Sequence, residues 1–226
     1  MKPKNHKKKK LDIIYEDKEI IVINKSAKQL CISTNKEHIH TLYSEVSAYV
    51  KKQNPKNKIF IVHRLDKDTS GLVLFAKNEK VKRMLQDNWD KLAINREYIA
   101  VVDGVMPKSK ETLKNYLKES KTLQVYVTDD TKNGKLAITN YEVLKHNKVY
   151  SMLKVNISTG RKNQIRVQLA NINHPIVGDK KYKARNNPLG RLALHANKLE
   201  IINPITKKNM LFTCNAPGSF AKMFDN

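Results

Sequence analysis

The residues with the clearest capacity for chemistry stand together in the stretch 63–71, which reads His-Arg-Leu-Asp-Lys-Asp-Thr-Ser-Gly. An apolar run from Leu72 to Ala76 follows directly and is typical of a buried strand. A polar loop held by a rigid strand is where catalytic groups are usually presented, and Gly71 permits a sharp turn there. Because a carboxylate can act as a nucleophile or as a base, we predict that Asp66 is catalytic.

The same loop has two simpler interpretations. The spacing Asp-x-Asp-x-Ser-Gly from Asp66 to Gly71 matches the opening of a calcium-binding loop, where alternate oxygen ligands precede a glycine at the sixth position. Such a loop requires Glu at its twelfth position, and this chain has Lys77 there. An ordinary solvated turn also suits Asp, Thr, Ser and Gly, and spacing alone leaves that alternative open.

A longer pattern resembles a known family. The run His-Arg-Leu-Asp-Lys-Asp-Thr-Ser-Gly-Leu at 63–72 is similar to the signature of RluA-type pseudouridine synthases, enzymes that isomerise uridine to pseudouridine in structured RNA. Further segments of that family follow in the expected order: Arg96-Glu97-Tyr98, Gly160-Arg161 with Gln164-Ile165-Arg166, His174 to Asp179, and Arg191 to Ala196. The resemblance covers the chain from about Ile13 to Cys214.

The resemblance implies a catalytic set of Asp66, Tyr98 and Arg166. The aspartate of Arg-Leu-Asp is the essential group in the family, and whether it attacks or abstracts a proton stays open. The arginine of Gln-Ile-Arg pairs with that aspartate, and a nearby cation favours the ionised carboxylate. The phenol of Tyr98 offers a stacking face for uracil and an oxygen for proton transfer.

Three further residues are expected to contact RNA. Arg64 stands two positions before Asp66, and in the family this arginine helps to hold the flipped-out RNA. Arg161 and Asn163 lie in the segment that leads to Gln-Ile-Arg. Where the family usually has histidine, this chain has Asn163, which can donate and accept hydrogen bonds as a neutral histidine does.

Composition agrees with a polyanionic partner. The 226 residues include 44 Lys and Arg against 21 Asp and Glu, which gives a formal net charge of +23. Lys and Arg contacts to phosphate release condensed counterions, so we expect salt-dependent binding to RNA. A generic DNA-binding protein would explain the charge but not the loop, and no helix-turn-helix or zinc-finger pattern is present in the sequence.

Cysteine content and hydropathy indicate the cellular compartment in which we expect the protein. Cys31 and Cys214 are too few for a disulfide framework, which favours the reducing cytoplasm. The sequence has no apolar run of the roughly 20 residues that a membrane span needs, so no membrane partner is expected. Because the isomerisation is redox-neutral and the sequence has no Cys/His cluster, no cofactor or metal is implied.

The expected organisation is a basic arm and one catalytic domain. Residues 1–10 hold a run of lysines and are expected to be a disordered tail that is solvated or touches RNA loosely. Residues 11–226 are expected to form the catalytic domain, with no separate N-terminal RNA-binding domain. No heptad pattern suggests a dimer, so we expect a monomer.

Periodicity predicts an α+β domain in which a mixed, mostly antiparallel central sheet is flanked by helices, and the family fold agrees. Strands are expected at 11–15, 19–24, 72–76 and 97–103, with a meander over 122–157. Helices are expected at 38–53, from Asn78 as a cap through Leu92, and around Ile165 to Ile172. Trp89 could stack on a base, but its spacing favours packing in the core.

These observations predict an RNA pseudouridine synthase that isomerises specific uridines in ribosomal or transfer RNA by flipping the base out to an essential aspartate. The alternative is a non-catalytic RNA-binding or ribosome-assembly protein on the same fold, because fold alone does not guarantee activity. A protein that only bound RNA would have no chemical need for Asp66, Tyr98 and Arg166 together, which favours the enzyme.

Overall fold

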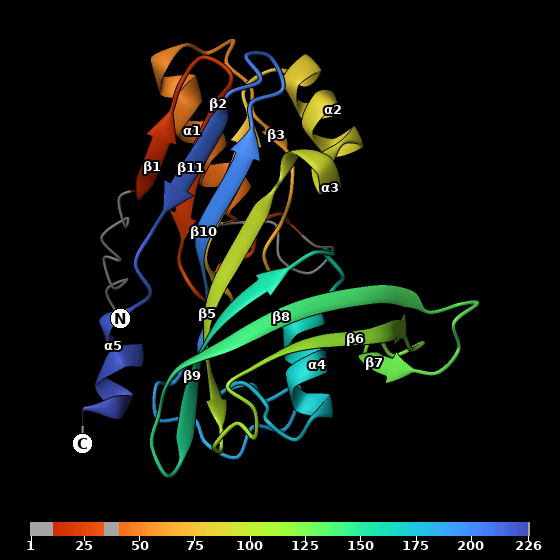
Figure 1. The fold of residues 1–226 in the computed structure, drawn as a ribbon. Helices are drawn as coiled ribbons and strands as arrows, with labels where there is room; N and C mark the ends of the chain where they lie inside the picture. Colours follow the sequence, from red (N-terminus) through yellow and green to blue (C-terminus); the bar gives the residue numbers. More distant parts are fainter. Residues whose placement is uncertain (1–10, 34–40, 226) are drawn as a thin grey trace.

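The structure is a computed structural model and describes residues 11–33 and 41–225 (Figure 1). The predicted basic arm, residues 1–10, lies outside the described residues. The strands are β1 (Ile13–Glu16), β2 (Ile20–Lys25), β3 (Phe60–Ile61), β4 (Ser70–Ala76), β5 (Asn95–Asp103), β6 (Lys110–Glu119), β7 (Val125–Thr128), β8 (Lys135–His146), β9 (Tyr150–Ile157), β10 (Leu194–Ile202) and β11 (Asn209–Thr213). The helices are α1 (Leu42–Gln53), α2 (Glu79–Asp87), α3 (Trp89–Leu92), α4 (Gln164–Asn171), α5 (Gly218–Ala221) and the 3-10 turn η1 (Lys222–Phe224).

The described strands form one 11-stranded sheet. Its main path runs β1-β2-β4-β10-β5-β9-β8-β6-β7, while β3 pairs with β4 and β11 pairs with β10. Among the pairings of these strands, β4 with β10 is parallel and the others are antiparallel. The predicted α+β fold with a mixed, mostly antiparallel sheet is therefore confirmed.

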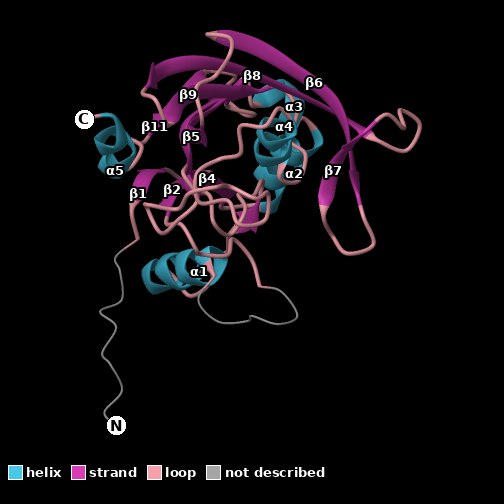
Figure 2. Ribbon diagram, turned by 90° about the horizontal axis from the view of Figure 1, so that it is seen from below, coloured by secondary structure: helices cyan, strands magenta, loops and turns pink. Residues whose placement is uncertain are grey.

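Helices cover both faces of the sheet around β2 and β4. Val73 and Phe75 pack in a cluster with residues of α1, whereas Leu72 and Leu74 pack with residues of α2. Side chains alternate between the two faces of a strand, so α1 and α2 lie on opposite sides, as Figure 2 shows. Every residue of β4 is buried for this reason, and the strand is a rigid support for the loop before it.

The other half of the sheet carries α4. Ile165 and Leu169 of this helix pack into a core cluster with β5 and β9, and Val167 packs with residues of β6, β7 and β8. The amide of Gln168 donates to the backbone carbonyls of Leu113 and Ala137, at 3.1 and 3.2 Å. These contacts fix the position of α4 beneath the β6–β8 strands, which extend to one side of the molecule in Figure 1.

Several expected elements are confirmed, one expected helix is divided, and strands β3, β6, β10 and β11 were not predicted. Asn78 caps α2 by accepting from the backbone N–H of Val81, as predicted. The single helix expected through Leu92 is instead two helices, because Asn88 leaves helical geometry with φ −122° and ψ 21°. Strand β6 was not predicted, since its buried residues Leu113 and Leu117 are four positions apart, a spacing typical of a helix.

The helix expected from residue 38 begins at Leu42, after the cap residue Thr41, whose side chain accepts from the backbone N–H of Ser44. Residues 38–40 lie outside the described residues. The hairpin of β1 and β2 and the helix around Ile165 are present as expected. The meander expected over 122–157 is only partly correct, because β8 pairs with β9 whereas β7 pairs with β6.

Candidate active site

The loop between β3 and β4 carries Asp66, and its backbone is fixed by contacts from β2 and the segment after it. The N–H and C=O of Leu65 both contact the thiol sulfur of Cys31, at 3.4 and 3.3 Å. The carbonyl of Lys67 accepts from the ammonium of Lys25 at 3.1 Å. Because hydrogen bonds on either side of Asp66 hold the chain, this carboxylate has a defined position.

Gly71 ends the loop where β4 meets β10. Its φ is +113°, a conformation that side chains rarely adopt, and a Cβ at this position would lie 2.2 Å from the carbonyl oxygen of Ala196. A residue with a side chain is therefore excluded by backbone strain and by the approach of β10. Gly71 thus needs the backbone freedom of glycine, as expected, but it lies at the start of β4 and not in a sharp turn.

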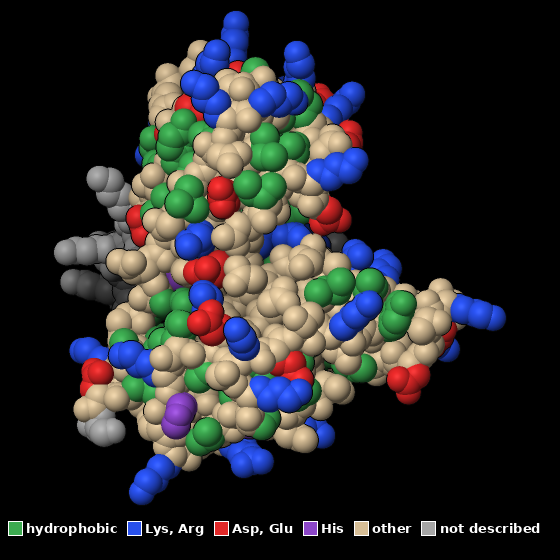
Figure 3. Space-filling view, in the orientation of Figure 1, with side chains coloured by type: hydrophobic (Ala, Val, Ile, Leu, Met, Phe, Trp, Pro, Cys, Tyr) green, Lys and Arg blue, Asp and Glu red, His purple; other side chains and the backbone are tan. Residues whose placement is uncertain are grey.

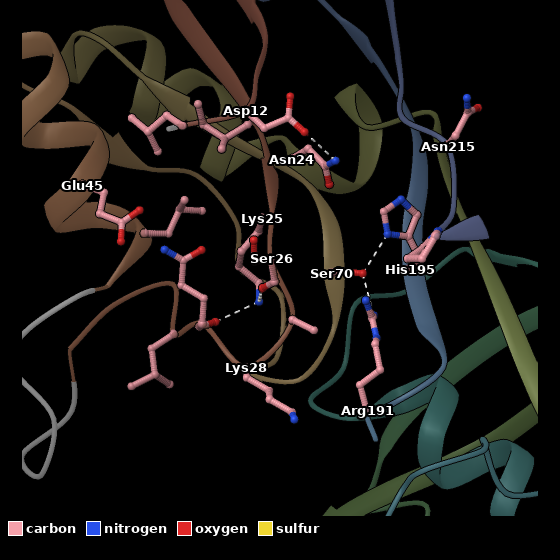
Figure 4. Close-up of a pocket in the computed structure, with 17 residues that line it drawn as sticks. Asp12, Asn24, Lys25, Ser26, Lys28, Glu45, Ser70, Arg191, His195 and Asn215 are labelled. Atoms are coloured by element: carbon pink, nitrogen blue, oxygen red, sulfur yellow. Dashed lines mark hydrogen bonds between the residues drawn. The ribbon is translucent and has the colours of Figure 1, made fainter. Parts of the chain in front are cut away.

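A pocket of about 610 Å3 is lined by Arg191 and His195 of the Arg191–Ala196 segment. Both side chains contact Ser70, at the end of the loop that carries Asp66. Figure 4 shows the hydroxyl of Ser70 between Nδ1 of His195, at 2.8 Å, and Nη2 of Arg191, which donates at 2.7 Å. Burial lowers the pKa of His195 to about 4, so the imidazole is neutral near pH 7. Sequence analysis assigned no role to His195 or Arg191, and the structure places them as supports of the loop.

A cleft of about 580 Å3 opens on the other side of the loop. It lies between α3 and α4, which Figure 1 shows above and below the middle of β5. The residues predicted for catalysis and for RNA contact all line it: Arg64, Asp66, Tyr98, Arg161, Asn163 and Arg166. The fold thus brings together six side chains that come from three separate parts of the sequence.

Arg166 lies in this cleft within a network of hydrogen bonds. Its Nη1 donates to Oδ2 of Asp66 at 3.2 Å and to Oδ1 of Asn163 at 2.9 Å. Its Nε and Nη2 donate to the two oxygens of Asp179, at 2.7 and 2.8 Å. Paired donation of this kind sets the plane of the guanidinium, so Asp179 orients the group that faces Asp66.

Burial and ion pairing change the pKa of Arg166 in opposite directions. Burial alone would lower its pKa, but the hydrogen bonds and negative charge of Asp179, with those of Asp66, raise the pKa above the ordinary value. The side chain of Asp179 is fully buried, whereas that of Asp66 is 31% exposed. Asp179 is therefore the permanent counterion, and Asp66 is the carboxylate that a ligand in the cleft can reach.

Asn163 supports Arg166 at the start of α4. It has a left-handed backbone conformation with φ 53°, and its side chain is buried. Its amide donates to the hydroxyl of Tyr182 at 3.2 Å, and that hydroxyl donates to the carbonyl of Val125. Both ends of the Asn163 amide are engaged within the protein, in agreement with its expected ability to donate and accept.

Tyr98 lies in β5 and is partly buried at the cleft. Burial raises the pKa of its phenol to about 12, with a smaller opposing effect from the positive charge of Arg96. The hydroxyl is therefore protonated near neutral pH. A protonated phenol can donate a hydrogen bond to a base in the cleft, and its ring offers an apolar face.

The basic residues at the rim of the cleft are more open. Arg64 and Arg161 are exposed, and Arg161 is tied to the β8 strand through a bond from its Nε to the carbonyl of Leu136 at 3.0 Å. Lys and Arg side chains are frequent on the face shown in Figure 3, including the arm formed by β6–β8. The cleft is thus surrounded by positive potential that attracts a polyanion.

Sequence analysis missed Asp179, Lys25 and Tyr182 as parts of the site. Asp179 lies in a family segment to which no role was assigned, and Lys25 and Tyr182 were likewise assigned no role. Each lies far from Asp66 in sequence, so local patterns could not reveal the contact. Across the described residues, no group of three or more His, Cys, Asp or Glu is arranged to hold a metal ion.

A partly exposed carboxylate, paired with a fixed guanidinium beside a phenol and surrounded by basic side chains, defines a site for acid–base or nucleophilic chemistry on a nucleic acid. Comparison with known proteins agrees. The family model described as RNA pseudouridylate synthase matches residues 19–171. The chain belongs to this family, whose members are isomerases that act on RNA.

Relatives match along most of the chain. The uncharacterized RNA pseudouridine synthase YhcT of Bacillus subtilis is 32% identical over 209 residues, which are 92% of this chain and 68% of the relative. Ribosomal large subunit pseudouridine synthase D of Escherichia coli (strain K12) is 31% identical over 229 residues, covering 95% of this chain and 70% of the relative.

Solved structures show the same fold. The structure titled Human RNA Pseudouridylate Synthase Domain Containing 1 superposes with a TM-score of 0.75 at 23% identity, covering 92% of this chain and 84% of that one.

None of the helices in the described parts of the chain combines the length and apolar character that crossing a bilayer demands.

Proposed function

We propose that this chain isomerises specific uridines in ribosomal or transfer RNA, with Asp66 as the catalytic group and Tyr98 and Arg166 as its partners. The observation that carries the proposal is the ion pair between Arg166 and Asp66 in a cleft lined by Tyr98. The relative from Escherichia coli is named for the large ribosomal subunit, which supports ribosomal RNA as a substrate class.

The reaction fits the groups in the cleft. The bond between the ribose and a uracil nitrogen must break, the base must turn, and a ring carbon must bond to the ribose. The carbon loses a proton and the nitrogen gains one, so the change is redox-neutral. Asp66 can act as nucleophile toward the nucleoside or as the base that takes the proton.

Arg166 and Tyr98 have complementary roles in this proposal. The guanidinium orients the carboxyl group of Asp66 and places a positive charge beside it, through the bond from Nη1 to Oδ2. The protonated phenol of Tyr98 lies against the detached uracil and donates a hydrogen bond, which keeps the base in the cleft while it turns. Extrusion of a uridine from a duplex costs a few kcal/mol and less from a loop, so loop uridines are the preferred targets.

RNA contact outside the reacting nucleotide is assigned to the basic rim. Arg64 and Arg161 are exposed beside the cleft and can reach phosphates of the flipped strand. Asn163 contributes from within, by orienting Arg166. In this proposal, residues 1–10 add positive charge as a tether for RNA, and residues 11–226 form one catalytic domain. The protein acts in the cytoplasm as a monomer.

The test is pseudouridine mapping on total RNA from cells with and without this gene, complemented by wild type or by Asp66→Asn. Sites that vanish on deletion and return with wild type alone support the proposal and identify the RNA. If no site changes, or if Asp66→Asn restores every site, the catalytic assignment is wrong. A non-catalytic role in RNA binding or ribosome assembly would then take its place.

A further inference from the structure

Trp89 occupies a position that its role in the core does not fully explain. It begins α3, is only partly buried, and lines the same cleft as Asp66 and Tyr98. Part of its side chain packs against the apolar cluster around β4 and α2. A partly exposed indole in a nucleic-acid cleft is a stacking surface, because every base has an apolar face that an aromatic ring can cover.

The indole is held in place by the loop that carries Asp66. The rings of His63 and Trp89 stack with centroids 4.7 Å apart and an angle of 20° between their planes. Nε2 of His63 accepts from the backbone N–H of Leu74 at 3.0 Å, which ties the imidazole to β4. Burial, with a smaller effect of Arg96, lowers the pKa of His63 to about 3, so this support is uncharged near pH 7.

Arg96 supplies a positive charge to the same part of the cleft. It stands two residues before Tyr98 in β5, so both side chains face the same side of the strand. Its side chain is 8% exposed, and Nη2 donates to the carbonyl of Ser158 at 2.8 Å. Within the residues that the structure describes, its buried Nε has no hydrogen-bond partner.

The pairing of Arg96 with protein anions is weak. The nearest carboxylate oxygen in an ion pair is that of Asp90, 3.7 Å from Nη2, and this side chain is 74% exposed. A buried cation without a close carboxylate attracts anions from the cleft. The combination of an indole and an incompletely neutralised guanidinium matches the two parts of a nucleotide, its base and its phosphate.

We propose that Trp89 and Arg96 form a subsite for the nucleotide next to the target uridine. The indole stacks on the base of that nucleotide, and the guanidinium attracts its phosphate. When the target uridine turns into the cleft, its neighbour loses a stacking partner, and Trp89 replaces that partner. This inference rests on the proposed function, because the neighbour is defined only by a uridine that occupies the position beside Asp66.

A fluorescence titration tests the contact directly. Trp89 is the only tryptophan in the chain, so the intrinsic emission of the protein reports on this residue. Full-length Asp66→Asn protein would be titrated with a uridine heptanucleotide, and with a heptamer that keeps the central uracil but has abasic riboses at the other positions. Anisotropy of a dye at the 5′ end would follow the binding of both RNAs independently.

We expect the complete heptamer to quench the emission in a saturable manner, and the heptamer with abasic neighbours to lose this effect. Equal quenching by both RNAs at saturation would show that a neighbouring base does not reach Trp89. Absence of quenching by a fully bound complete heptamer would have the same meaning. Either result overturns the subsite.

Kinetics with the RNA identified by mapping provide a second test. Trp89→Leu should raise KM about tenfold, since stacking on an aromatic side chain contributes this much to binding of a base, and should change kcat less. Trp89→Phe should fall between the leucine variant and wild type. The matched control is Tyr126→Leu, which removes an exposed aromatic side chain of β7 outside the cleft lining and should keep the wild-type KM.

The outcomes separate this inference from the proposed function. If wild type makes pseudouridine but both Trp89 variants keep the wild-type KM, the subsite is wrong and the proposed function stands. If wild type modifies no cellular RNA, the proposed function fails, and the fluorescence comparison still decides whether Trp89 contacts a base. The same comparison decides the matter if the leucine variant does not fold, because it uses the intact indole.

Discussion

Arg166 and Lys25 are two buried cations that contact the loop of Asp66 from two different pockets, and the protein neutralises them differently. Arg166 donates to the carboxylates of Asp179 and Asp66. Lys25 donates to three backbone carbonyls, one of which is that of Lys67 in the loop. The first cation has charged partners and the second has the partial charges of peptide groups.

The pKa values show the consequence of this difference. Burial lowers the pKa of Lys25 to about 8, and the more distant negative charges near it compensate only in part. The carboxylates raise the pKa of Arg166 despite its burial. The cation that faces Asp66 thus has carboxylate counterions and stays charged, whereas the cation that holds the loop backbone is left close to its titration range.

The largest effect is expected when the counterion of Arg166 is removed. Asp179→Asn leaves a buried guanidinium with only the partly exposed Asp66 as its charged partner. We expect the free energy of unfolding to fall by about 3 to 5 kcal/mol, the usual result of breaking a buried ion pair. Denaturant unfolding monitored by circular dichroism measures this change.

A matched control for this change is Glu142→Gln, which removes one member of the exposed pair with Lys154. That variant should have nearly the wild-type free energy of unfolding, because exposed ion pairs contribute little. If Asp179→Asn is as stable as the control, Asp179 is not the permanent counterion and the contrast with Lys25 disappears.

Next in size is the pH dependence conferred by Lys25. Between its folded-state pKa of about 8 and its ordinary value of 10.5, the unfolded state binds more protons, so stability rises with pH. The difference in unfolding free energy between wild type and Lys25→Met should therefore increase by about 3 kcal/mol from pH 7 to above pH 10. Unfolding curves of both proteins at several pH values measure it, and the shared titrating groups cancel.

A pH-independent difference between wild type and Lys25→Met would mean that the ammonium is not perturbed by its burial. Lys28→Met is a suitable control, because Lys28 lines the same pocket without contacts to the loop carbonyls. It removes one positive charge from the same pocket, so a pH-dependent difference that is specific to Lys25→Met belongs to the buried ammonium of Lys25.

A smaller effect is expected from Arg166→Lys. Lysine keeps the positive charge but cannot donate to Asp179 with two parallel bonds while also reaching Asp66. Misplacement of a catalytic partner by about 1 Å lowers rates about 100-fold, so kcat should fall by this factor, near 2.7 kcal/mol. Single-turnover pseudouridine formation measures it, and a wild-type rate would show that charge alone is sufficient.

The smallest effect is expected on the other side of the loop. Ser70→Ala removes the hydroxyl that contacts His195 and Arg191. We expect a loss of about 1 to 2 kcal/mol in unfolding free energy, since two partners lose a hydrogen bond. The reduction in kcat should be smaller than that of Arg166→Lys. If Ser70→Ala lowered kcat more than Arg166→Lys, the contacts of Ser70 would matter more for the reaction than those of Arg166.

The candidate site could be predicted in part from sequence because the family motifs carry Asp66, Tyr98 and Arg166. The structure brings these three residues to one cleft, while their roles stay predictions. Asp179 could not be assigned, because its importance arises from a contact with Arg166 that local spacing does not encode. The same holds for Lys25, which directly follows the strand expected at 19–24 and gives no local sign of its contact with Lys67.

The fold, like the site, could be predicted only in part from the sequence. Short apolar runs predicted β2 and β4, which are buried along almost their whole length, and the alternation of Leu153, Val155 and Ile157 predicted β9. Strand β6 was not predicted because its buried residues Leu113 and Leu117 have helical spacing, and its partners on β7 and β8 decide its conformation. Asn88 interrupts the expected helix because its own backbone leaves helical geometry, and the residue types around it do not indicate this break.

The position of β10 also affects how the chain folds during its synthesis. Strands β4 and β5 follow each other with two helices between them, yet β10 lies between them in the sheet. Ser70 and its partner His195 are 125 residues apart, which a ribosome translates in roughly 6 to 25 s. During that time Ser70 and Gly71 at the start of β4 lack their partners on β10, so this part of the strand is open to pairing with other chains until β10 has been made.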